Sequence, residues 1–419
     1  MTNRSLHAVL VERTSPRLLE LLAAALDGSG PAIAPVDAGL PASRLEQLLG
    51  ALAPDTVEDP RGVTTARSGQ RKNAVAEGTA VVIATSGSTG TPKGVELSAA
   101  ALLHSARASL ARLGVRPGER WLCCLPATYI AGLQVLVRSL VSGTDPVLAD
   151  RADAETVASS GCAHVSLVPT QLQRLLPDRH ADIPINRDIP NPLNPLDPLD
   201  PLGPLAGFSS VLLGGAAAPA ALLDAARAAG VPVVTTYGMT ETCGGCVYDG
   251  IPLDGVQIKI DDGRIWIGGP VLFSGYRGEP RSERLFRTGD LGYLDASGRL
   301  TVRGRSDGLI NTGGYKVVPG EVAAALQDCP GVRDAAVLGQ PDPEWGERVI
   351  AVVVPTDPAN PPTLELLRLH VRERLPRYAA PSRVVVVDAV PMLSNGKHDI
   401  ARLRREVLRR EQTEAESVT

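Results

Sequence analysis

The sequence has few aromatic residues, few cysteines and no long apolar run. Aromatic residues make up 3% of its 419 residues, and it contains 6 cysteines. So few cysteines exclude the disulfide framework of a small secreted domain. Cys243 and Cys246 form a CxxC pair, but no second pair lies at the spacing of a zinc site. This pair has two readings, a metal or redox role and small residues that line a pocket.

The charge and the N-terminal residues exclude further classes of protein. The net charge of −4 at pH 7 offers no strongly basic surface for nucleic acid. The first residues, MTNRSLHAVLVERTSPRLLE, lack the sustained apolar region of a secretory signal, and no stretch approaches the roughly 18 apolar residues of a membrane-spanning helix. We therefore expect a cytoplasmic protein with no nucleic-acid partner and no stable insertion in a membrane.

Apolar residues, glycine and proline are abundant and indicate an α/β protein with many loops. The apolar fraction is 44%, with 42 glycines and 35 prolines. Two amphipathic helices are expected near 16–27 and 42–53, and strands alternate with helices from 81 to about 180. Such alternation predicts parallel-rich sheets covered by helices, followed by a β-rich subdomain that ends near 303. We expect an N-terminal domain over 1–304 and a small, mobile α+β domain over 305–419, whose last polar residues, 411–419, are frayed.

Residues 190–205, PNPLNPLDPLDPLGPL, carry a proline at every third position from Pro192 to Pro204. Proline lacks an N–H, so this segment suits neither a helix interior nor a central strand. We expect a polyproline-like surface insertion. It also matches the PxxP pattern, so a ligand for an SH3-type domain is the alternative to a tolerated loop.

The stretch TSGSTGTPKG, 85–94, has the composition of a loop that holds an anion. It follows an apolar strand, VVIAT, and precedes a helix that we expect to begin after Ser98 and to end at Gly114. Glycines let backbone N–H groups approach phosphate oxygens. The spacing does not match the nucleotide-binding pattern G-x-x-x-x-G-K-[ST], and a plain surface turn is the alternative. The candidate phosphate ligands are Thr85, Ser86, Gly87, Ser88, Thr89, Gly90, Thr91 and Lys93.

Four further stretches carry chemistry of the same kind: YGMTET (237–242), RTGD (287–290), GRSDGLINTGGYKVVPGE (304–321) and PMLSNGKHD (391–399). The first follows an apolar strand, where ligands bind in α/β sheets. Tyr237 offers a ring to stack on a base, and Glu241 offers a carboxylate for Mg²⁺ near phosphates. Asp290 can accept hydrogen bonds from ribose hydroxyls. An Asx-turn is the plainer role for Asp290.

Together and in this order, the five stretches resemble the adenylate-forming superfamily of acyl-CoA synthetases, luciferases and peptide-synthetase adenylation domains. The resemblance covers roughly residues 81–405. It implies that the loop holds the β- and γ-phosphates of ATP, and that LLGGAA lines the adenine and acyl pocket. The residues of that pocket segment are Gly214, Gly215 and Ala216.

The resemblance also assigns roles to single positions. Tyr237 would stack on adenine, with Gly238 beside it in the nucleotide-binding segment. Thr240 would contact the α-phosphate, and Glu241 would bind Mg²⁺. Asp290 would bind the ribose, with Arg305 beside it.

Three roles fall in the C-terminal part. Lys397 would bridge the substrate carboxylate and the α-phosphate, and Asp307 would be the hinge between the domains. Gly313 and Gly314 would leave room for the pantetheine arm of CoA after the small domain has rotated. A solvated lysine and a plain loop carboxylate are the simpler roles for Lys397 and Asp307.

The acid is suggested by LPATYIAGLQVLVRSL, 125–140, which resembles the acyl-pocket segment of the o-succinylbenzoate–CoA ligases of menaquinone synthesis. Arg138 matches their arginine and would pair with the aromatic carboxylate of a dicarboxylic acid. A surface arginine paired with an acid is the alternative. Tyr129 departs from the histidine usual in that family and leaves the fit of the substrate open.

The resemblance thus implies an enzyme that uses ATP, Mg²⁺, CoA and a small carboxylic acid. Another aryl- or acyl-CoA ligase and an enzyme that loads a carrier protein are the alternatives. A homodimer is left open.

Overall fold

The computed structural model describes residues 4–12, 14–67, 74–86, 92–175, 203–393 and 397–417. The candidate phosphate ligands Gly87, Ser88, Thr89, Gly90 and Thr91 lie outside these residues, as does the greater part of the proline-rich insertion. The chain divides into two compact units. One comprises Met1–Gly215, Ala226–Ile258 and Ile267–Phe286, and the other comprises Ala216–Ala225, Lys259–Trp266 and Arg287–Thr419.

The first unit contains two sheets. In the described residues, the first sheet has the order β17-β16-β6-β5-β2-β1-β3-β4. Its strands are β1 (Leu6–Val11), β2 (Ala32–Asp37), β3 (Thr56–Glu58), β4 (Thr64–Ala66), β5 (Thr79–Ser86), β6 (Pro92–Ser98), β16 (Gly275–Tyr276) and β17 (Glu279–Pro280). β6 runs antiparallel to β5, so these two strands flank the expected phosphate loop.

The second sheet is parallel through its centre. Its order is β13-β12-β11-β10-β9-β7-β8, and β7 to β11 pair in parallel before β12 and β13 turn back. The strands are β7 (Trp121–Cys123), β8 (Val147–Leu148), β9 (His164–Leu167), β10 (Ser210–Leu213), β11 (Val233–Met239), β12 (Gly244–Tyr248) and β13 (Ile251–Pro252). The parallel-rich sheets predicted from the alternation are therefore confirmed.

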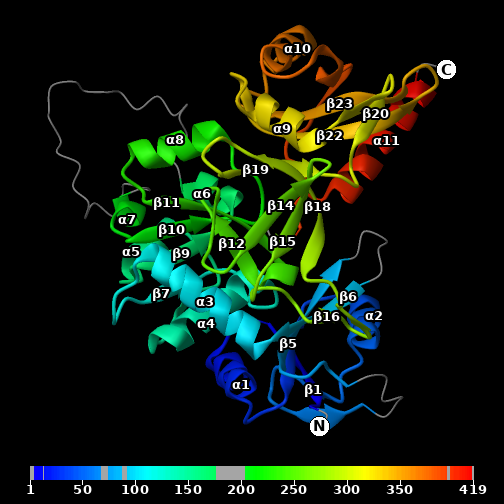
Figure 1. The fold of residues 1–419 in the computed structure, drawn as a ribbon. Helices are drawn as coiled ribbons and strands as arrows, with labels where there is room; N and C mark the ends of the chain where they lie inside the picture. The colour runs from blue at the N-terminus through cyan, green and yellow to red at the C-terminus, as the bar shows by residue number, and fades with distance from the viewer. Residues whose placement is uncertain are drawn as a thin grey trace, which may run out of the picture. The chain divides into compact units, whose positions relative to one another are not determined.

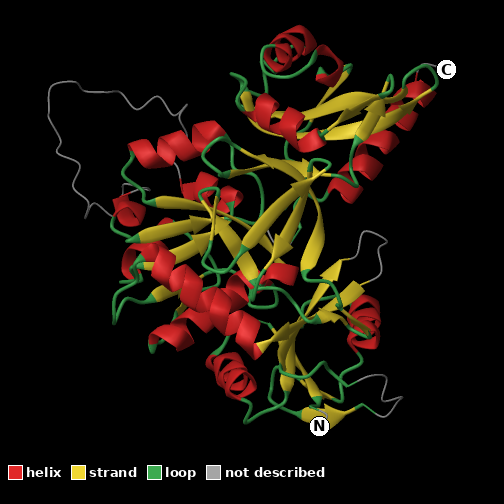
Figure 2. Cartoon of the chain, in the orientation of Figure 1, coloured by secondary structure: helices red, strands yellow, loops and turns green. Residues whose placement is uncertain are grey.

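Helices cover both sheets (Figures 1 and 2). They are α1 (Pro16–Asp27), α2 (Ala42–Leu52), α3 (Ala99–Leu113), α4 (Ile130–Ser142), α5 (Ala154–Ser159), α6 (Pro169–Leu175), α7 (Gly203–Ala206) and α8 (Ala220–Ala228). α1 packs on β2 and β5, α4 packs on β7, β9 and β12, and α3 contacts strands of both sheets. The apolar faces of α1, α3 and α4 share one core with the inner faces of the sheets.

The bounds of α3 follow from its sequence. The Ser98 hydroxyl accepts a hydrogen bond from the Ala101 N–H at 3.1 Å, and Gly114 ends the helix with a φ of 64°. A side-chain acceptor at the N-cap and a left-handed glycine at the C-cap each satisfy backbone groups that the helix leaves unpaired. The expected helix after Ser98 is confirmed. The proline-rich segment was expected to contain no helix, but its end, from Gly203, forms α7.

Four strands form the β-rich stretch in the order β14-β15-β18-β19 within the described residues. They are β14 (Gln257–Asp261), β15 (Arg264–Gly268), β18 (Leu285–Leu294) and β19 (Leu300–Arg305). β18 and β19 pair antiparallel, and their register places Asp290 opposite Arg305. The hairpin therefore brings two of the expected nucleotide-binding residues together.

The second unit contains a mixed sheet in which β20, β21, β22 and β23 follow one another in the order β21-β20-β23-β22, and β24 pairs with β23. Its elements are β20 (Ile310–Thr312), β21 (Tyr315–Val317), α9 (Pro319–Gln327), β22 (Val332–Asp342), β23 (Gly346–Pro355), α10 (Leu364–Arg372), β24 (Arg383–Val386) and α11 (Ile400–Ser417). This is the α+β module expected from the sequence.

The expectation of a frayed end is wrong for the described residues, because α11 continues to Ser417. Leu403 and Val407, four residues apart, lie on the buried side of α11 and pack into an apolar cluster with β22 and β23. This anchor stabilises the helix although its last residues are polar. No helix in the described part of the chain combines the length and apolar character needed to cross a bilayer.

Candidate active site

The β5–β6 hairpin places the two ends of the phosphate loop side by side. Thr85 lies opposite Lys93, and Ser86 lies opposite Pro92. The Thr85 hydroxyl is 3.5 Å from the Lys93 carbonyl oxygen. The Lys93 side chain is exposed. The hairpin thus presents a cation beside a hydroxyl at the base of a glycine-rich turn, which suits a bound phosphate.

Tyr276, on β16, connects Lys93 to the expected metal ligand Glu241. Its hydroxyl donates to the Glu241 Oε1 atom at 3.0 Å, and the Lys93 ammonium lies 4.9 Å from the centre of its ring. Sequence reasoning did not name Tyr276. The contact depends on β16 pairing with β6, a pairing between segments about 180 residues apart that no local pattern in SGYRGEP indicates.

Thr240 and Glu241 lie in a short 3-10 helix, Thr240–Thr242, directly after β11. The Glu241 carbonyl accepts a hydrogen bond from the Phe273 N–H at 2.9 Å. Both side chains are half-buried, as is that of Tyr237 two residues before the end of β11. The backbone therefore holds a hydroxyl, a carboxylate and an aromatic ring close together at the carboxyl end of a strand.

Glycines allow this strand end to pack tightly. A Cβ at Gly238 would lie 2.0 Å from the Gly244 carbonyl oxygen, and a Cβ at Gly214 would lie 2.2 Å from the Thr236 Oγ1 atom. Gly215 has a φ of +83°, which disfavours any other residue. Gly215 and Ala216 are exposed. The LLGGAA segment therefore leaves backbone uncovered after β10.

Arg138 lies on α4 and is only 4% exposed. Its guanidinium carbon lies 4.3 Å from the ring centre of Trp121, and its Nη2 donates to the Ser166 hydroxyl at 3.1 Å. The Nε atom is buried without a hydrogen-bond partner among the described residues. The alternative of a surface arginine is excluded. Burial lowers the pKa of Arg138, but an arginine remains charged at neutral pH.

Tyr129 occupies the N-cap of the same helix. Its side chain makes no capping hydrogen bond and is half-buried.

The cysteines give no support to a metal or redox role. Cys243 and Cys246 are fully buried, and burial raises the pKa of the Cys246 thiol to about 12. Such a thiol is unreactive at neutral pH. Among the described residues, no group of three or more histidine, cysteine or acidic side chains is arranged to hold a metal ion.

In the second unit, Arg305 lies between two carboxylates. Its Nη1 is 3.6 Å from the Asp290 Oδ1 atom, and its Nε and Nη2 donate to Asp307 at 3.1 and 2.6 Å. The Arg305 contact lowers the pKa of Asp307. Asp290 is buried, and its N–H donates to the Thr288 hydroxyl at 3.0 Å. The expected ribose ligand, its neighbour and the expected hinge residue therefore form one cluster.

The two expected CoA-tunnel glycines differ in their surroundings. A Cβ at Gly313 would lie 2.8 Å from the Trp345 ring, whereas nothing lies within 4 Å of the Cβ position of Gly314. A hollow of about 210 Å³ near them is lined by Thr312, Trp345, Arg348, Val349, Tyr378, Ala380 and Ser382. The space at Gly313 is taken by an indole ring, while Gly314 is open.

Lys397 lies in a turn after β24. Its side chain is exposed, and its carbonyl oxygen accepts a hydrogen bond from the Leu393 N–H at 2.7 Å. Met392 and His398 form a β-bridge, and the His398 Nε2 atom lies 3.1 Å from Asp334. These contacts fix the backbone on both sides of Lys397, and its side chain extends into solvent.

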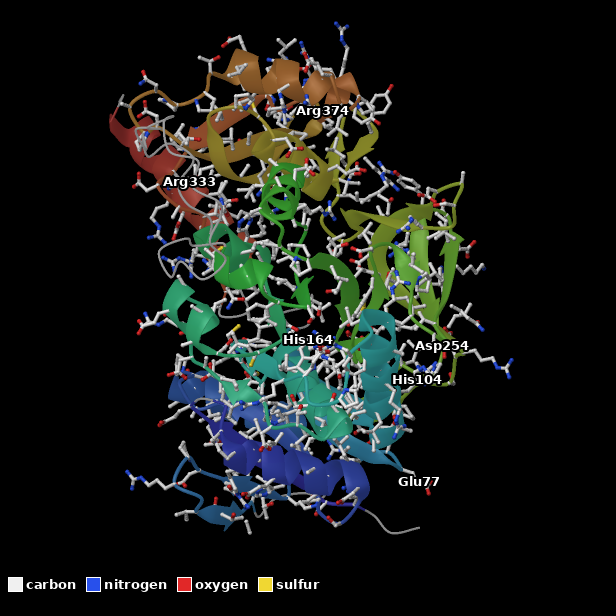
Figure 3. All side chains as sticks on the ribbon, turned by 90° about the vertical axis from the view of Figure 1, so that its left-hand side faces the viewer. Glu77, His104, His164, Asp254, Arg333 and Arg374 are labelled. Carbon is white, nitrogen blue, oxygen red and sulfur yellow. The ribbon has the colours of Figure 1, made fainter. Side chains whose placement is uncertain are left out.

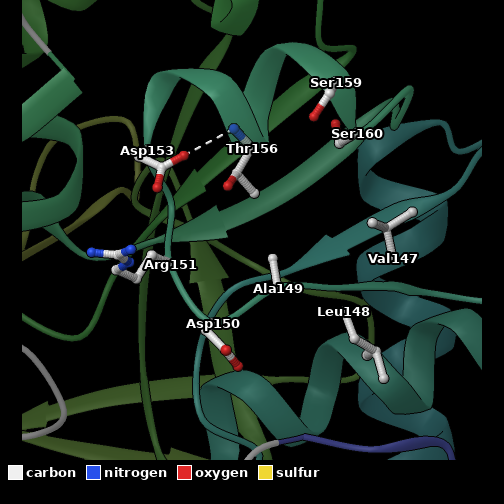
Figure 4. Close-up of a pocket in the computed structure, with 9 residues that line it drawn as sticks. All are labelled: Val147, Leu148, Ala149, Asp150, Arg151, Asp153, Thr156, Ser159 and Ser160. Carbon is white, nitrogen blue, oxygen red and sulfur yellow. Dashed lines mark hydrogen bonds between the residues drawn. The ribbon is translucent and has the colours of Figure 1, made fainter.

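A surface hollow of about 450 Å³ lies elsewhere in the first unit (Figure 4). It is lined by Val147, Leu148, Ala149, Asp150, Arg151, Asp153, Thr156, Ser159 and Ser160. The Asp153 carboxylate accepts the Thr156 N–H at 2.9 Å and caps α5. None of the site residues expected from the sequence lines this hollow, so we do not assign the site to it.

Comparison with known proteins covers nearly the whole chain. The AMP-binding enzyme family model matches residues 8–277, and the model of the AMP-binding enzyme C-terminal domain matches residues 321–397. The probable 2-succinylbenzoate–CoA ligase of Mycobacterium tuberculosis is 42% identical over 96% of this chain and 98% of the relative. The 2-succinylbenzoate–CoA ligase of Enterococcus faecalis is 33% identical over 77% of this chain and 68% of the relative.

Solved structures agree. The o-succinylbenzoate CoA synthetase of Bacillus subtilis, in complex with an acyl-adenylate intermediate, is 26% identical with a TM-score of 0.76 and covers 95% of this chain and 88% of its own. ATP-bound MatB of Rhodopseudomonas palustris shares the fold, with a TM-score of 0.80 at 22% identity over 97% of this chain and 89% of its own. These matches confirm the resemblance to the adenylate-forming enzymes. The chain belongs to the AMP-binding enzyme family, among the 2-succinylbenzoate–CoA ligases.

Proposed function

We propose that this protein is an ATP-dependent 2-succinylbenzoate–CoA ligase of menaquinone biosynthesis. In the first step an acid carboxylate oxygen attacks the α-phosphorus of ATP, which forms an acyl-adenylate and releases pyrophosphate. In the second step the CoA thiol attacks the acyl carbonyl and releases AMP. The first step uses ATP and the second uses CoA, which supports a cytoplasmic location. The observation that carries the assignment of the acid is the buried Arg138 guanidinium.

The first step must overcome the repulsion between a carboxylate and a triphosphate. Preorganised cations lower such a barrier because they stabilise the charge that develops on the transferred group. We assign Lys93 to the phosphates and Lys397 to the meeting point of the carboxylate and the α-phosphate. Thr240 donates its hydroxyl to the α-phosphate in this scheme. Lys397 then serves only the first step, because the second has no charged phosphate as its target.

Glu241 suits a magnesium ion. Mg²⁺ is bound by one or two carboxylates together with substrate phosphates, and the Tyr276 hydroxyl orients the Glu241 carboxylate by a 3.0 Å hydrogen bond. A bound Mg²⁺ supplies positive charge against the phosphate oxygens. Tyr276 itself does not contact the nucleotide in this proposal, and acts through Glu241 and through the Lys93 ammonium on its ring.

Two groups of residues are assigned to the nucleoside, one to the adenine and one to the ribose. Tyr237 stacks on the adenine, and the exposed backbone of the pocket segment lets the ring approach closely. The pocket segment comprises Gly214, Gly215 and Ala216, and Gly238 belongs to the adjoining strand end. Asp290 accepts hydrogen bonds from the ribose, and Arg305 offsets its charge at 3.6 Å.

The acid is assigned to α4. Arg138 carries a charge that no carboxylate among the described residues compensates, since its hydrogen-bond partners are the uncharged side chains of Ser166 and Tyr248, and a buried charge without an opposite charge beside it costs several kcal/mol. A carboxylate of the substrate would relieve this cost and would accept charge-assisted hydrogen bonds. An acid with two carboxylates can use one for this contact and the other for the reaction. Tyr129, at the start of α4, completes the assigned acid-binding residues.

The thiol step is assigned to the C-terminal domain, residues 305–419, which would rotate about Asp307 relative to residues 1–304. Gly314, with open space at its Cβ position, is the residue that would let the pantetheine arm pass. Gly313 has a second reason to be glycine, since the Trp345 ring occupies its side-chain space.

The reaction itself tests the proposal. We expect purified protein given ATP, Mg²⁺, CoA and 2-succinylbenzoate to form AMP, pyrophosphate and a CoA thioester, measured by mass spectrometry against a panel of aryl and alkyl acids. ADP in place of AMP would contradict the two-step scheme. Product with other acids only would point to another acyl-CoA ligase, and adenylate formation that ignores free CoA would point to an enzyme that loads a carrier protein.

Lys397→Ala separates the two steps. We expect pyrophosphate release to fall by a factor on the order of 10² or more, while supplied acyl-adenylate is still converted to thioester, because only the first step needs the ammonium. Lys259→Ala is the matched control, since Lys259 is an exposed lysine in a surface ion pair with Asp261. Equal losses in both steps would contradict the role assigned to Lys397.

Tyr276→Phe tests the support of Glu241. The variant keeps the ring beneath Lys93 but loses the hydrogen bond to Glu241. A hydrogen bond to a charged group contributes about 1.5 kcal/mol or more, so we expect the Mg²⁺ concentration for half-maximal pyrophosphate release to rise about tenfold. Tyr293→Phe, at an exposed tyrosine, is the control. An unchanged Mg²⁺ dependence would remove Tyr276 from the site.

Arg138→Leu tests the acid pocket. The leucine removes the charge but keeps an apolar volume on α4, so we expect KM for 2-succinylbenzoate to rise by about tenfold or more and KM for benzoate to change little. Steady-state kinetics with both acids measures this difference. Arg107→Leu, at an exposed arginine on α3, is the control. Equal effects on the KM values of the two acids would show that Arg138 does not bind the second carboxylate.

A further inference from the structure

Three buried side chains form a row across the centre of the second sheet. Trp121 on β7, His164 on β9 and Ser210 on β10 are register partners on neighbouring parallel strands. Residues in register on adjacent strands point to the same face of a sheet. Each of the three is at most 3% exposed, and Figure 3 shows His164 in the interior of the molecule. The row lies on the face of the sheet that α4 covers, because Arg138 of α4 contacts Trp121.

Two hydrogen bonds fix the His164 ring. Its Nδ1 lies 2.8 Å from the Ser210 Oγ atom, and its Nε2 lies 3.1 Å from the Glu119 Oε2 atom. Hydrogen bonds to the Glu119 carboxylate, first of all from the Arg116 backbone N–H, lower the pKa of Glu119 to about 2. The carboxylate is therefore ionised and can only accept a hydrogen bond from His164. Burial lowers the pKa of His164. A neutral ring must then donate from Nε2 to Glu119 and accept at Nδ1 from the Ser210 hydroxyl.

The fixed imidazole supports Trp121. The two rings stack with their centres 4.8 Å apart and an angle of 30° between their planes. Trp121 in turn contacts the Arg138 guanidinium at 4.3 Å. Cation–ring attraction is strongest where water is excluded, and both residues are buried.

The second contact of Arg138 comes from the same strand as His164. Ser166 lies two residues after His164 on β9, so it faces the same side of the sheet, and its hydroxyl accepts from the Arg138 Nη2 atom at 3.1 Å. An arginine side chain loses about 2 kcal/mol of rotamer entropy when it is held in one position. The sheet thus holds the guanidinium before any ligand arrives.

We propose that Trp121 and His164 are positioning residues that hold the Arg138 guanidinium ready for the second carboxylate of the acid. This inference rests on the proposed function. It adds two residues that no sequence motif indicates and makes the selection of a dicarboxylic acid a property of the sheet as well as of Arg138. The alternative is that the stack only fills the core, in which case its loss would lower stability and leave acid selection unchanged.

Kinetics with two acids distinguishes these roles. We expect Trp121→Leu to raise KM for 2-succinylbenzoate about tenfold and to leave KM for benzoate and for ATP nearly unchanged, with Trp121→Phe in between because it keeps a ring. His164→Ala should change KM in the same direction as Trp121→Leu. Leu122→Ala is the matched control, because Leu122 is fully buried on the same strand and points to the opposite face.

The outcomes separate this inference from the proposed function. If Arg138→Leu leaves KM for 2-succinylbenzoate unchanged, the assigned acid pocket is wrong. If Arg138→Leu raises that KM but Trp121→Leu and His164→Ala do not, the pocket stands and the positioning role is overturned. A shift in Leu122→Ala equal to that in Trp121→Leu would also overturn it, because general loosening of the core would then explain both.

If Trp121→Leu does not fold, a fluorescence measurement tests the positioning role of Trp121 instead. The chain has three tryptophans, so Trp266→Phe combined with Trp345→Phe leaves Trp121 as the single emitter. We expect a saturable change in its emission on addition of 2-succinylbenzoate, and no such change when Arg138→Leu is added. Emission that stays constant while the same variant turns over the acid would overturn the inference.

Discussion

A guanidinium buried against an indole ring, with no carboxylate of the described chain beside it, is the constraint on which the proposed acid-binding part of the site depends. Arg138 is only 4% exposed, so solvent compensates little of its charge, and the anion proposed to do so is a carboxylate of the substrate. The chain tolerates this cost because two strands, β7 and β9, hold the side chain that α4 presents to them. Their contacts are made by Trp121 and Ser166, which no pattern in the sequence marks as functional.

The residues assigned to the nucleotide depend on a different constraint, because long-range strand pairing creates the contacts between their short polar segments. Lys93 belongs to a hairpin near the start of the chain, while Tyr276 belongs to a two-residue strand far along it. Pairing of β16 with β6 brings the tyrosine under the lysine and beside Glu241. Such a contact positions two opposite charges through one ring and one hydroxyl, without a direct ion pair between them.

Sequence reasoning recovered the parts of the fold that local patterns encode. The bounds of α3 were predicted correctly from Ser98 and Gly114, because the interactions that end a helix act within a few residues. The alternation of apolar strands with helices correctly predicted the parallel-rich sheets. Sequence reasoning did not predict β1 and β2, which pair with each other on either side of α1 in the chain, or β6, which returns antiparallel beside β5. Among the residues that we assign to the site, Glu241 and Arg138 were predicted from the sequence, whereas Tyr276 and Trp121 were not, since packing across strands decides which side chains meet. We also expected residues 411–419 to be frayed, whereas α11, anchored by Leu403 and Val407, continues to Ser417.

The Arg305 cluster has a consequence for any motion of the second unit. One guanidinium faces Asp290 at 3.6 Å and Asp307 at 2.6 Å, so it divides its donors unequally between them. A change in the backbone torsions at residue 307 carries one of these carboxylates away and frees donors for the other. The electrostatic environment of Asp290 is thereby coupled to the backbone conformation at residue 307, and a rotation there changes it without moving Asp290 itself.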